Sequence, residues 1–392
     1  MNFKELELGD IAKFKYGKMP KADKKVQNGY PIYTGYKISG YYSEYMYEEQ
    51  ALIIVARGVG GTGDVKLAPS KSYITNLAII IELDESKCDK KFMQLYLHSL
   101  NLRYLDSGSA QSQITINDLQ RLNIKIPSLD EQKKIASFIT LIEKKHDNNY
   151  RIISNLEKIP KTLFKYWFID FEFPNEKGLP YKSNGGAIVE SELGGIPRGW
   201  KVGCIGEVCE QVKDKVNLDK TEEIFNYIGL EHMPQGSIAL SNWESSEKVS
   251  GNKSLFKKDD ILFGKLRPYF KKVGVASIDG VCSTDILVFN SKQSFEKSYL
   301  LLNLIQDRFI EYTSNTATGT RMPRSGWKQI SSYKIVIPDE STLLNFEKKI
   351  SPMLKKIQDI THENLYLKEL RDILLPKLLS GEIVIPDESV VS

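Results

Sequence analysis

The sequence predicts an α+β protein with two pseudo-repeated α/β domains, each followed by a long helix, and with the two helices paired as a coiled coil. The stretch I-K-I-P-S-L-D-E-Q-K-K-I, which ends at Ile135, returns as K-I-V-I-P-D-E-S-T-L-L-N-F-E-K-K-I, which ends at Ile350. Each copy closes a strand-like segment, passes a proline and opens a charged run with apolar residues at helical spacing. The segments that precede the two copies also follow one order. A long-period repeat of this kind indicates duplicated domains.

The expected parts follow from composition along the chain. With 392 residues, of which 41% are hydrophobic, the chain is long enough for two to three domains. A stretch rich in Gly, Pro, Asn and Ser after the first helix is typical of a linker. The predicted parts are a first domain at residues 1–128, a long helix at 129–169, a linker at 170–193, a second domain at 194–338, a second long helix at 339–385 and a tail at 386–392.

Both long helices carry a heptad pattern. An offset of 215 residues carries Ile135 to Ile350 and also Asn149 to Asn364. A repeat of about 3.5 residues is typical of a coiled coil, and an Asn at its seam restricts register and orientation at a cost in stability. The first helix would place Phe138, Lys145, Ile152 and Ile159 in the second seam row. The residues predicted to pair the helices are Ile135, Ile142, Asn149, Ile152, Ile350, Ile357, Asn364 and Leu367. Two ordinary amphipathic helices on separate cores are the alternative.

Three phrases recur at equivalent places in the two domains. An apolar strand ends in a basic, glycine-containing turn, as I-I-V-A-R-G-V-G and as I-L-F-G-K-L-R-P. Thr75-Asn76 precedes L-A-I-I-I, and Thr284-Asp285 precedes I-L-V-F. Finally, S-G-S-A-Q-S-Q-I-T corresponds to A-T-G-T-R-M-P-R-S-G-W. A shared plan with divergent detail predicts two domains that recognise different things.

Charge and cysteine content limit the possible partners and compartments. A net charge of +4, from 54 basic and 50 acidic residues, predicts at most a local basic site for nucleic acid. The four cysteines lack CxxC spacing and are too few for a disulfide framework, which favours a reduced cytosolic compartment. The start of the chain has no apolar signal region, and no later run reaches the length of a membrane span.

Several longer phrases carry a family resemblance. They are G-I-P-R-G-W-K-V, D-D-I-L-F-G-K-L-R-P-Y-F-K-K-V, T-G-T-R-M-P-R, L-E-K-I-P-K-T-L-F-K-Y-W-F and L-R-D-I-L-L-P-K-L-L-S-G-E. With these phrases in this order, essentially the whole chain resembles type I restriction-modification specificity subunits. The resemblance implies two target-recognition domains, each of which reads one half of an asymmetric bipartite site in double-stranded DNA. It also implies two antiparallel helices that space the domains.

The resemblance further implies partner subunits in a bacterial or archaeal cytoplasm. The helices would dock modification subunits, two of them, which methylate adenine, and restriction subunits with translocase and nuclease activity would join them. S-adenosylmethionine, ATP and Mg would belong to those partners, so that this chain would hold no cofactor and no metal and would carry no catalytic residue.

Local chemistry separately supports DNA binding. Residues 263–272 interleave cations with aromatic side chains; lysines there can neutralise phosphates, and an arginine can bond bidentately to guanine. The equivalent loop of the first domain is rich in glutamine, which can read adenine. The predicted DNA contacts are Tyr33, Lys37, Arg57, Thr75, Gln111, Gln113, Lys265, Arg267, Tyr269, Lys271, Thr284, Arg321 and Arg324.

Each of these contacts has a plainer alternative. Lys271 and its neighbouring lysine could form a solvated surface, and the tyrosines around Tyr33 could pack a small core. Thr75 and Thr284 are typical turn formers. The aromatic residues 166–173 could dock a modification subunit or only cap the helical core.

Catalytic motifs are hard to find in the sequence. Residues 58–63 match the dinucleotide pattern G-x-G-x-x-G, but the following D-V-K-L-A-P-S-K-S-Y lacks the helical period that a pyrophosphate site needs. The sequence also lacks a Walker loop, H-E-x-x-H, G-x-S-x-G and the Asn/Asp-Pro-Pro-aromatic signature of amino-methyltransferases. A nucleotide-binding enzyme and a coiled-coil adaptor without DNA contacts remain as alternatives to the DNA-reading subunit.

Overall fold

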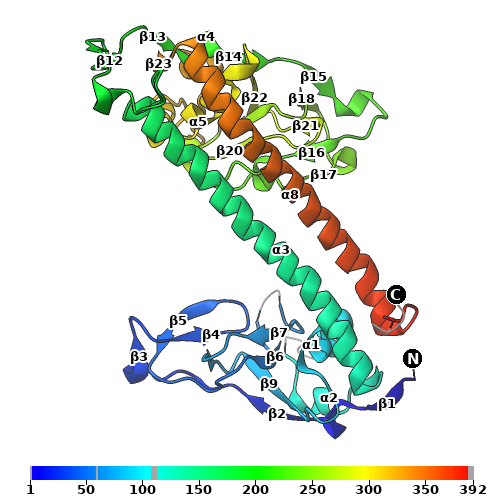
Figure 1. Ribbon diagram of the computed structural model, residues 1–392. Coiled ribbons are helices and arrows are strands. Elements are labelled where there is room, and N and C mark those ends of the chain that lie inside the picture. Colours follow the sequence, from blue (N-terminus) through cyan, green and yellow to red (C-terminus); the bar gives the residue numbers. More distant parts are fainter. Residues whose placement is uncertain (1, 59–60, 107–112, 387–392) are drawn as a thin grey trace. The chain divides into compact units, whose positions relative to one another are not determined.

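The computed structural model describes residues 2–58, 61–106 and 113–386. It divides into two compact units: unit 1 comprises the described parts of 1–144 and 368–392, and unit 2 comprises 145–367. Helix α3 (Leu129–Phe164) and helix α8 (Glu340–Ser380) each contribute to both units (Figure 1). The mixture of helices and sheets in two repeated domains confirms the predicted α+β fold. Among the described residues, no helix is long and apolar enough to cross a membrane.

Unit 1 is built around a four-stranded antiparallel sheet with strand order β2-β9-β6-β7. Its central strand β6 (Ala51–Val55) is buried along its whole length, which explains the uninterrupted apolar run A-L-I-I-V. The other strands and helices are β1 (Lys4–Glu7), β2 (Ala12–Tyr16), β3 (Lys25–Val26), β4 (Tyr30–Tyr33), β5 (Ile38–Tyr42), β7 (Val65–Ala68), β8 (Tyr73–Ile74), β9 (Ala78–Leu83), β10 (Asn123–Ile126), α1 (Lys90–Ser99) and α2 (Ile116–Gln120).

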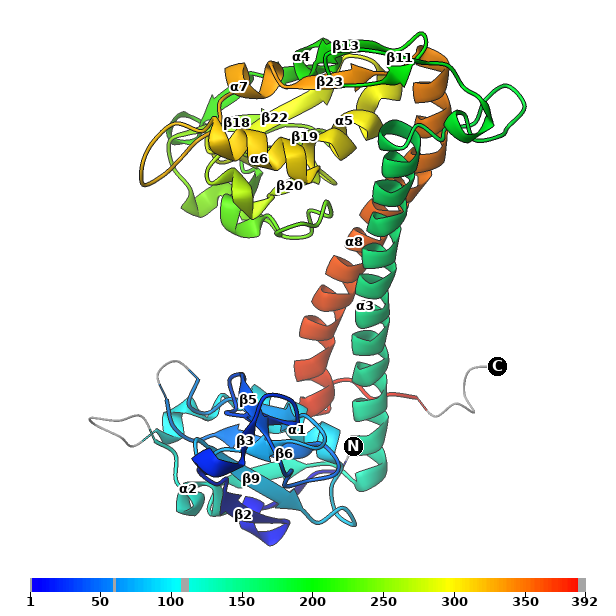
Figure 2. The ribbon, with the colours of Figure 1, turned by 90° about the vertical axis from the view of Figure 1, so that its left-hand side faces the viewer.

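Unit 2 repeats this sheet with strand order β14-β22-β19-β20, and β19 (Ile261–Gly264) is again buried throughout. Helices α5 (Lys297–Leu304) and α6 (Asp307–Asn315) lie beside this sheet (Figure 2). The other elements are β11 (Ile188–Val189), β12 (Ile196–Pro197), β13 (Lys201–Cys204), α4 (Ile205–Val208), β14 (Cys209–Val212), β15 (Lys215–Asn217), β16 (Asn226–Ile228), β17 (Glu244–Ser245), β18 (Asn252–Phe256), β20 (Val273–Val275), β21 (Gly280–Cys282), β22 (Ile286–Ser291), α7 (Trp327–Ser331) and β23 (Lys334–Ile337).

The repeat extends to single hydrogen bonds. In unit 1 the pair β1–β10 leads into α3, and in unit 2 the pair β13–β23 leads into α8. Gln132 of α3 accepts a hydrogen bond from the backbone N–H of Asp89, at 2.9 Å, just before α1. Glu347, which lies 215 residues after Gln132, accepts one from the N–H of Ser298 at 2.8 Å, at the start of α5. Each long helix therefore holds its own domain in the same way.

The second sheets of the two domains differ. In unit 1 the order is β3-β5-β4-β8, with β4 and β5 joined by a short turn. In unit 2 the order is β15-β18-β21-β16-β17, so that β18 pairs directly with β21. The connection between β16 and β18, residues 229–251, is much longer than the turn at 34–37 and contributes strand β17. This insertion changes which strands are neighbours.

In unit 2, α3 and α8 run antiparallel (Figures 1 and 2). Asn149 donates from Nδ2 to Oδ1 of Asn364 at 2.9 Å, and the rings of Phe164 and Phe346 lie 6.4 Å apart between centroids. Because Asn149 and Asn364 are equivalent in the repeat, the local two-fold relation of the helices passes through this pair. A buried polar pair at a seam restricts helix register.

One seam row has the predicted burial, and the other does not. Ile135 and Ile142 are buried in unit 1, and Ile350 and Ile357 are buried in unit 2. Ile152 and Leu367 are half-buried, but Ile159 is 47% exposed. Lys145 is also exposed and pairs with Glu363 at 3.1 Å. The buried face of α3 turns instead through Ile153 and Glu157, because this helix packs on the second domain as well as on α8.

The predicted linker is an ordered segment. Residues 170–200, which we name the collar, pack around Phe173, whose ring stacks on Tyr181 at 4.6 Å and on Trp200 at 4.7 Å. The Trp200 ring in turn lies 5.9 Å from that of Phe168, just after α3. The indole N–H of Trp200 donates to Asp339, at the start of α8, at 2.9 Å. The aromatic residues of this segment therefore order it, and its role as a linker between the two domains stays a prediction.

Candidate nucleic-acid interface

In unit 2, the three recurrent phrases meet where β19 ends. The backbone N–H of Lys265 donates to the carbonyl of Asp285 at 3.0 Å, and the N–H of Ser325 donates to the carbonyl of Lys265 at 3.0 Å. The N–H of Arg267 donates to the carbonyl of Pro323 at 2.9 Å. The turn after β19, the turn before β22 and the loop before α7 thus form one surface.

The third of these segments is a hairpin, which we name the finger (residues 318–324). The N–H of Thr318 donates to the carbonyl of Arg324 at 3.0 Å, and the reverse bond is 2.9 Å long. The Arg324 guanidinium grips Asp285 with Nε–Oδ1 at 2.8 Å and Nη2–Oδ2 at 3.2 Å. The hydrogen bond from Arg324 lowers the pKa of the Asp285 carboxyl. Arg324 was predicted to contact DNA, but its fork is occupied by this carboxylate.

The other predicted contacts in unit 2 differ in availability. Arg267, Arg321 and Thr284 are exposed, and Tyr269 is 52% exposed beside Phe270. Neither arginine side chain has a polar partner within the described residues.

The lysines of this surface are more constrained. Lys265 is half-buried, and Lys271 forms an ion pair with Asp307 at 2.5 Å. A surface ion pair contributes only about 0–1 kcal/mol, so Lys271 can still exchange Asp307 for a phosphate.

In unit 1, the equivalent segments meet where β6 ends. The N–H groups of Ala56 and Arg57 both donate to the carbonyl of Leu77, at 2.8 and 3.2 Å. Arg57 forms an isolated antiparallel bridge with Gln113, as Leu266 does with Arg324 in unit 2. Both units therefore join the same three segments, with different side chains at each place.

The predicted contacts of unit 1 are placed as follows. The Arg57 guanidinium lies over the ring of Tyr16 at 5.7 Å, and Lys37 is exposed in the turn between β4 and β5. Tyr33 is half-buried against the core. Thr75 is 5% exposed and accepts from the N–H of Leu77 at 3.4 Å, which fits the alternative of a turn former. Gln113 is half-buried, and Gln111 lies outside the described residues.

Three residues at this surface were not predicted from the sequence. Tyr16 lies under Arg57, and the exposed Lys18 is held beside β8 because its N–H donates to the carbonyl of Ile74 at 3.0 Å. Tyr36 donates from its hydroxyl to the carbonyl of Arg57 at 2.9 Å. The run K-Y-G-K at residues 15–18, in which cations alternate with an aromatic residue, was the signal that could have revealed the first two.

The described glycines of the run at residues 58–63 lie against other parts of the protein. A Cβ at Gly58 or Gly61 would lie 2.4 Å from the Tyr36 side chain, and one at Gly63 would lie 2.7 Å from the backbone of Arg103. The next element is strand β7, so no helix N-terminus is available for a pyrophosphate. The described geometry thus lends no support to the alternative of a nucleotide-binding enzyme that uses this turn.

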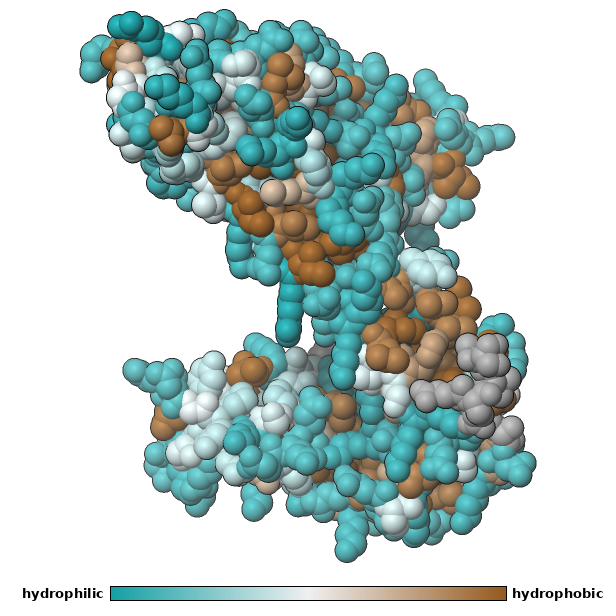
Figure 3. Space-filling view, in the orientation of Figure 1, coloured by the Kyte–Doolittle hydropathy of each residue, from teal (hydrophilic) through white to brown (hydrophobic). Residues whose placement is uncertain are grey.

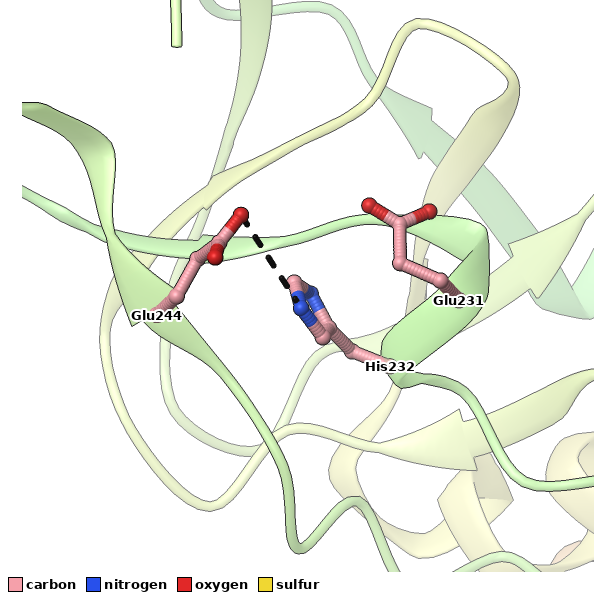
Figure 4. A group of neighbouring side chains, drawn as sticks. All are labelled: Glu231, His232 and Glu244. Carbon is pink, nitrogen blue, oxygen red and sulfur yellow. Dashed lines mark ion pairs between the residues drawn. The ribbon is translucent and has the colours of Figure 1, made fainter. Parts of the chain in front are cut away.

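Glu231, His232 and Glu244 form the one described group with spacing that could hold a metal, with ligand atoms within 4.8 Å of one another (Figure 4). However, Nδ1 of His232 accepts from the N–H of Gly229 at 2.9 Å. In the neutral ring the proton is therefore on Nε2, which lies 4.0 Å from Glu244. This tautomer presents an N–H and no lone pair to the carboxylates, so the geometry favours a long polar contact with Glu244 and not a metal site.

The buried thiols are poor nucleophiles. Burial raises the pKa of Cys88 and of Cys282 to about 12, and it also raises the pKa of Cys209. A thiol must ionise to attack a substrate. These three cysteines are therefore core residues.

Comparison with known proteins identifies a family. The model of the type I restriction modification DNA specificity domain matches residues 1–158 and 197–370. The type I restriction enzyme MjaIX specificity subunit of Methanocaldococcus jannaschii is 28% identical over 293 residues, which cover 72% of this chain and 65% of the relative. The chain thus spans just under two thirds of that relative.

A second relative and a solved structure match over nearly the whole chain. The type I restriction enzyme EcoDI specificity subunit of Escherichia coli is 22% identical over 424 residues, which cover 97% of this chain and 92% of the relative. The crystal structure of the type I restriction-modification system S subunit from M. genitalium has a TM-score of 0.63 at 18% identity, and the match covers 98% of this chain and 96% of that chain. At this identity, the likeness shows a common fold.

Proposed function

The chain belongs to the family of type I restriction-modification DNA specificity proteins, and from this premise we propose that each of its domains reads one half of an asymmetric, bipartite site in double-stranded DNA. In this proposal the chain is not itself catalytic. It assembles with adenine-methyltransferase modification subunits, two of them, and restriction subunits with translocase and nuclease activity join the full complex in the cytoplasm. Those partners supply S-adenosylmethionine, ATP and Mg.

One observation carries this proposal: equivalent loops meet at equivalent strand ends, with different chemistry in each domain. Unit 2 presents the exposed cations Arg267 and Arg321. Unit 1 presents Arg57 next to an amide, Gln113. Arginine suits guanine and phosphate, whereas glutamine suits adenine. Two different surfaces on one plan are what an asymmetric site requires.

The long helices support the assembly part of the proposal. Brown, hydrophobic patches lie along both helices on the face seen in Figure 3. In unit 2, Ile159 of α3 and Leu344 of α8 are 47% and 48% exposed, and Ile169 at the end of the first helix is 42% exposed. Exposed apolar groups of this kind mark protein interaction sites. We infer that the modification subunits bind here.

The aromatic run after α3 has two roles in this view. Trp167, Phe168 and Phe173 are buried and cap the helical core. Tyr166, at 41% exposure, faces solvent and is available to a modification subunit. In this proposal, the two interpretations of residues 166–173 apply to different side chains of the run.

Reconstitution tests the proposal. The chain should co-purify with the modification subunit encoded beside it, and the complex should transfer methyl groups from S-adenosylmethionine to adenine in genomic DNA. Omission of this chain should abolish methyl transfer. If the chain forms a stable complex with the modification subunit, but the modification subunit alone methylates DNA equally well, the coiled-coil adaptor would be favoured instead.

A further inference from the structure

We propose that Arg321, at the tip of the finger, reads a guanine in the half-site of the second domain, and that the ion pair between Arg324 and Asp285 locks the finger in its reading position. This inference rests on the proposed function. It assigns different tasks to two arginines that are three residues apart in the sequence.

The finger has a defined shape. Two backbone hydrogen bonds between Thr318 and Arg324 close it. Gly319 has φ +104°, which favours glycine, and a Cβ there would lie 3.1 Å from the carbonyl oxygen of Met322. The chain therefore reverses within residues 319–323, which places Arg321 in the middle of the turn.

The base of the finger is fixed to the domain at two further points. The carbonyl of Pro323 accepts from the N–H of Arg267, and the N–H of Ser325 donates to the carbonyl of Lys265. Arg267 adopts φ +51°, a left-handed conformation that a non-glycine residue rarely adopts. Such residues persist where their surroundings hold them, and they cluster at functional sites.

The lock separates the two arginines by role. Arg324 donates from Nε and Nη2 to the Asp285 carboxylate, so its guanidinium cannot also form a bidentate bond to a base edge. The same pair neutralises a carboxylate that would otherwise repel DNA. Arg321 is exposed and has no polar partner in the described part of the chain, and the neighbouring Met322 is 47% exposed. Only Arg321 has a free guanidinium on the finger.

Guanine is the base that a free arginine fits best. Its O6 and N7 accept two parallel N–H bonds from one guanidinium in the major groove, and this is the commonest specific contact of arginine. Lys265, at the base of the finger, is placed to hold a phosphate. In unit 1, Asn76 and Gln113 occupy the places of Asp285 and Arg324, so the first domain has no such lock.

The test uses the complex of this chain with its modification subunits and duplex oligonucleotides that carry the methylated motif. Each guanine of the second half-site is replaced in turn by 7-deazaguanine, which lacks N7. For the wild type, we expect one replacement to slow methylation about tenfold, as befits loss of one bond of a bidentate pair. Arg321→Ala should slow methylation of the normal site by about 10- to 100-fold and should be insensitive to that replacement.

The matched controls are Arg321→Lys and variants of the lock. Arg321→Lys keeps the charge and can still donate to guanine N7, so it should retain part of the rate and of the sensitivity that Arg321→Ala loses. Asp285→Arg and Arg324→Asp should each slow methylation at least tenfold, and the double variant should recover most of the rate. Unchanged sensitivity to bases of the first half-site shows that each variant remains folded.

Three results would overturn the inference. Arg321→Ala could keep its sensitivity to every 7-deazaguanine. Arg321→Ala could instead weaken binding equally on all DNA sequences and lower the slope of log K against log salt concentration by about one. That result would make Arg321 a phosphate contact. If the double variant of Asp285→Arg and Arg324→Asp methylates DNA no faster than either single variant, the ion pair does not hold the finger in its reading position. Failure of the wild-type complex to methylate any site would instead refute the proposed function.

Discussion

The buried pair Asn149 and Asn364 gives a prediction with opposite signs for single and double variants. Asn149 donates to Asn364 at 2.9 Å and to Glu363 at 2.7 Å, and the two asparagines are 1% and 5% exposed. Asn149→Leu removes both bonds and leaves Asn364 buried without its partner. An unsatisfied buried polar group costs about 1–3 kcal/mol, and a bond to a charged group contributes about 1.5–3 kcal/mol.

A buried Leu returns part of this loss, about 1.5–3 kcal/mol. We therefore expect Asn149→Leu to lower the free energy of unfolding of unit 2 by about 2 kcal/mol. Asn364→Leu should lower the unfolding free energy of unit 2 by only about 1 kcal/mol, because Asn149 keeps its hydrogen bond to Glu363. The double variant gains two buried leucines and strands no amide, so its unfolding free energy should equal or exceed that of the wild type.

Tryptophan fluorescence during urea unfolding measures these changes. The four tryptophans are Trp167, Trp200, Trp243 and Trp327, and all belong to unit 2, so the signal reports this unit alone. Destabilisations that add in the double variant, to within about 0.5 kcal/mol, would show that the asparagines are not coupled and would refute this reasoning.

Three further predictions address the anchoring, the recognition and the spacing of the domains. Glu157 is 8% exposed and accepts from Ser237 Oγ at 2.6 Å and from the N–H of Ile238 at 2.8 Å. Glu157→Ala should therefore lower the unfolding free energy of unit 2 by about 3 kcal/mol, and Glu157→Gln should lower it by about 1 kcal/mol. Equal losses for the two variants in the same fluorescence assay would contradict this account. Arg267→Ala should relax the methylated motif only in the half read by the second domain, as mapped by sequencing of modified DNA, and loss of preference in both halves would contradict modular reading. Lengthening α3 by four residues adds about 6 Å, which is nearly two base-pair steps of about 3.4 Å. This change should alter the length of the spacer in the mapped motif and leave both half-sites unchanged. An unchanged spacer would show that the helix does not set the separation of the half-sites.

The repeat could be predicted from the sequence because equivalent residues of the two copies recur at a constant offset. The offset that relates Ile135 to Ile350 also relates Gln132 to Glu347, and both polar residues hold the helix of their own domain. The second heptad row was wrong at Lys145, because a helix that packs on two partners buries a wider and rotated face. A one-dimensional pattern cannot show the second partner.

The collar and the finger show what sequence patterns miss. Gly, Pro and Asn indicate turns, but the order of the collar comes from Phe173 between two distant rings. The basic residues of the finger were found by their charge, yet the sequence did not separate Arg324 from Arg321. That separation depends on Asp285, which lies 39 residues away and is brought close only by the pairing of β19 with β22.

The most direct test of the central claim is a genome-wide map of methylated adenines in cells that express this chain with its modification subunit. The account predicts one asymmetric motif in two parts, separated by a spacer of fixed length. A continuous or palindromic motif would contradict the claim that two different domains each read one half-site.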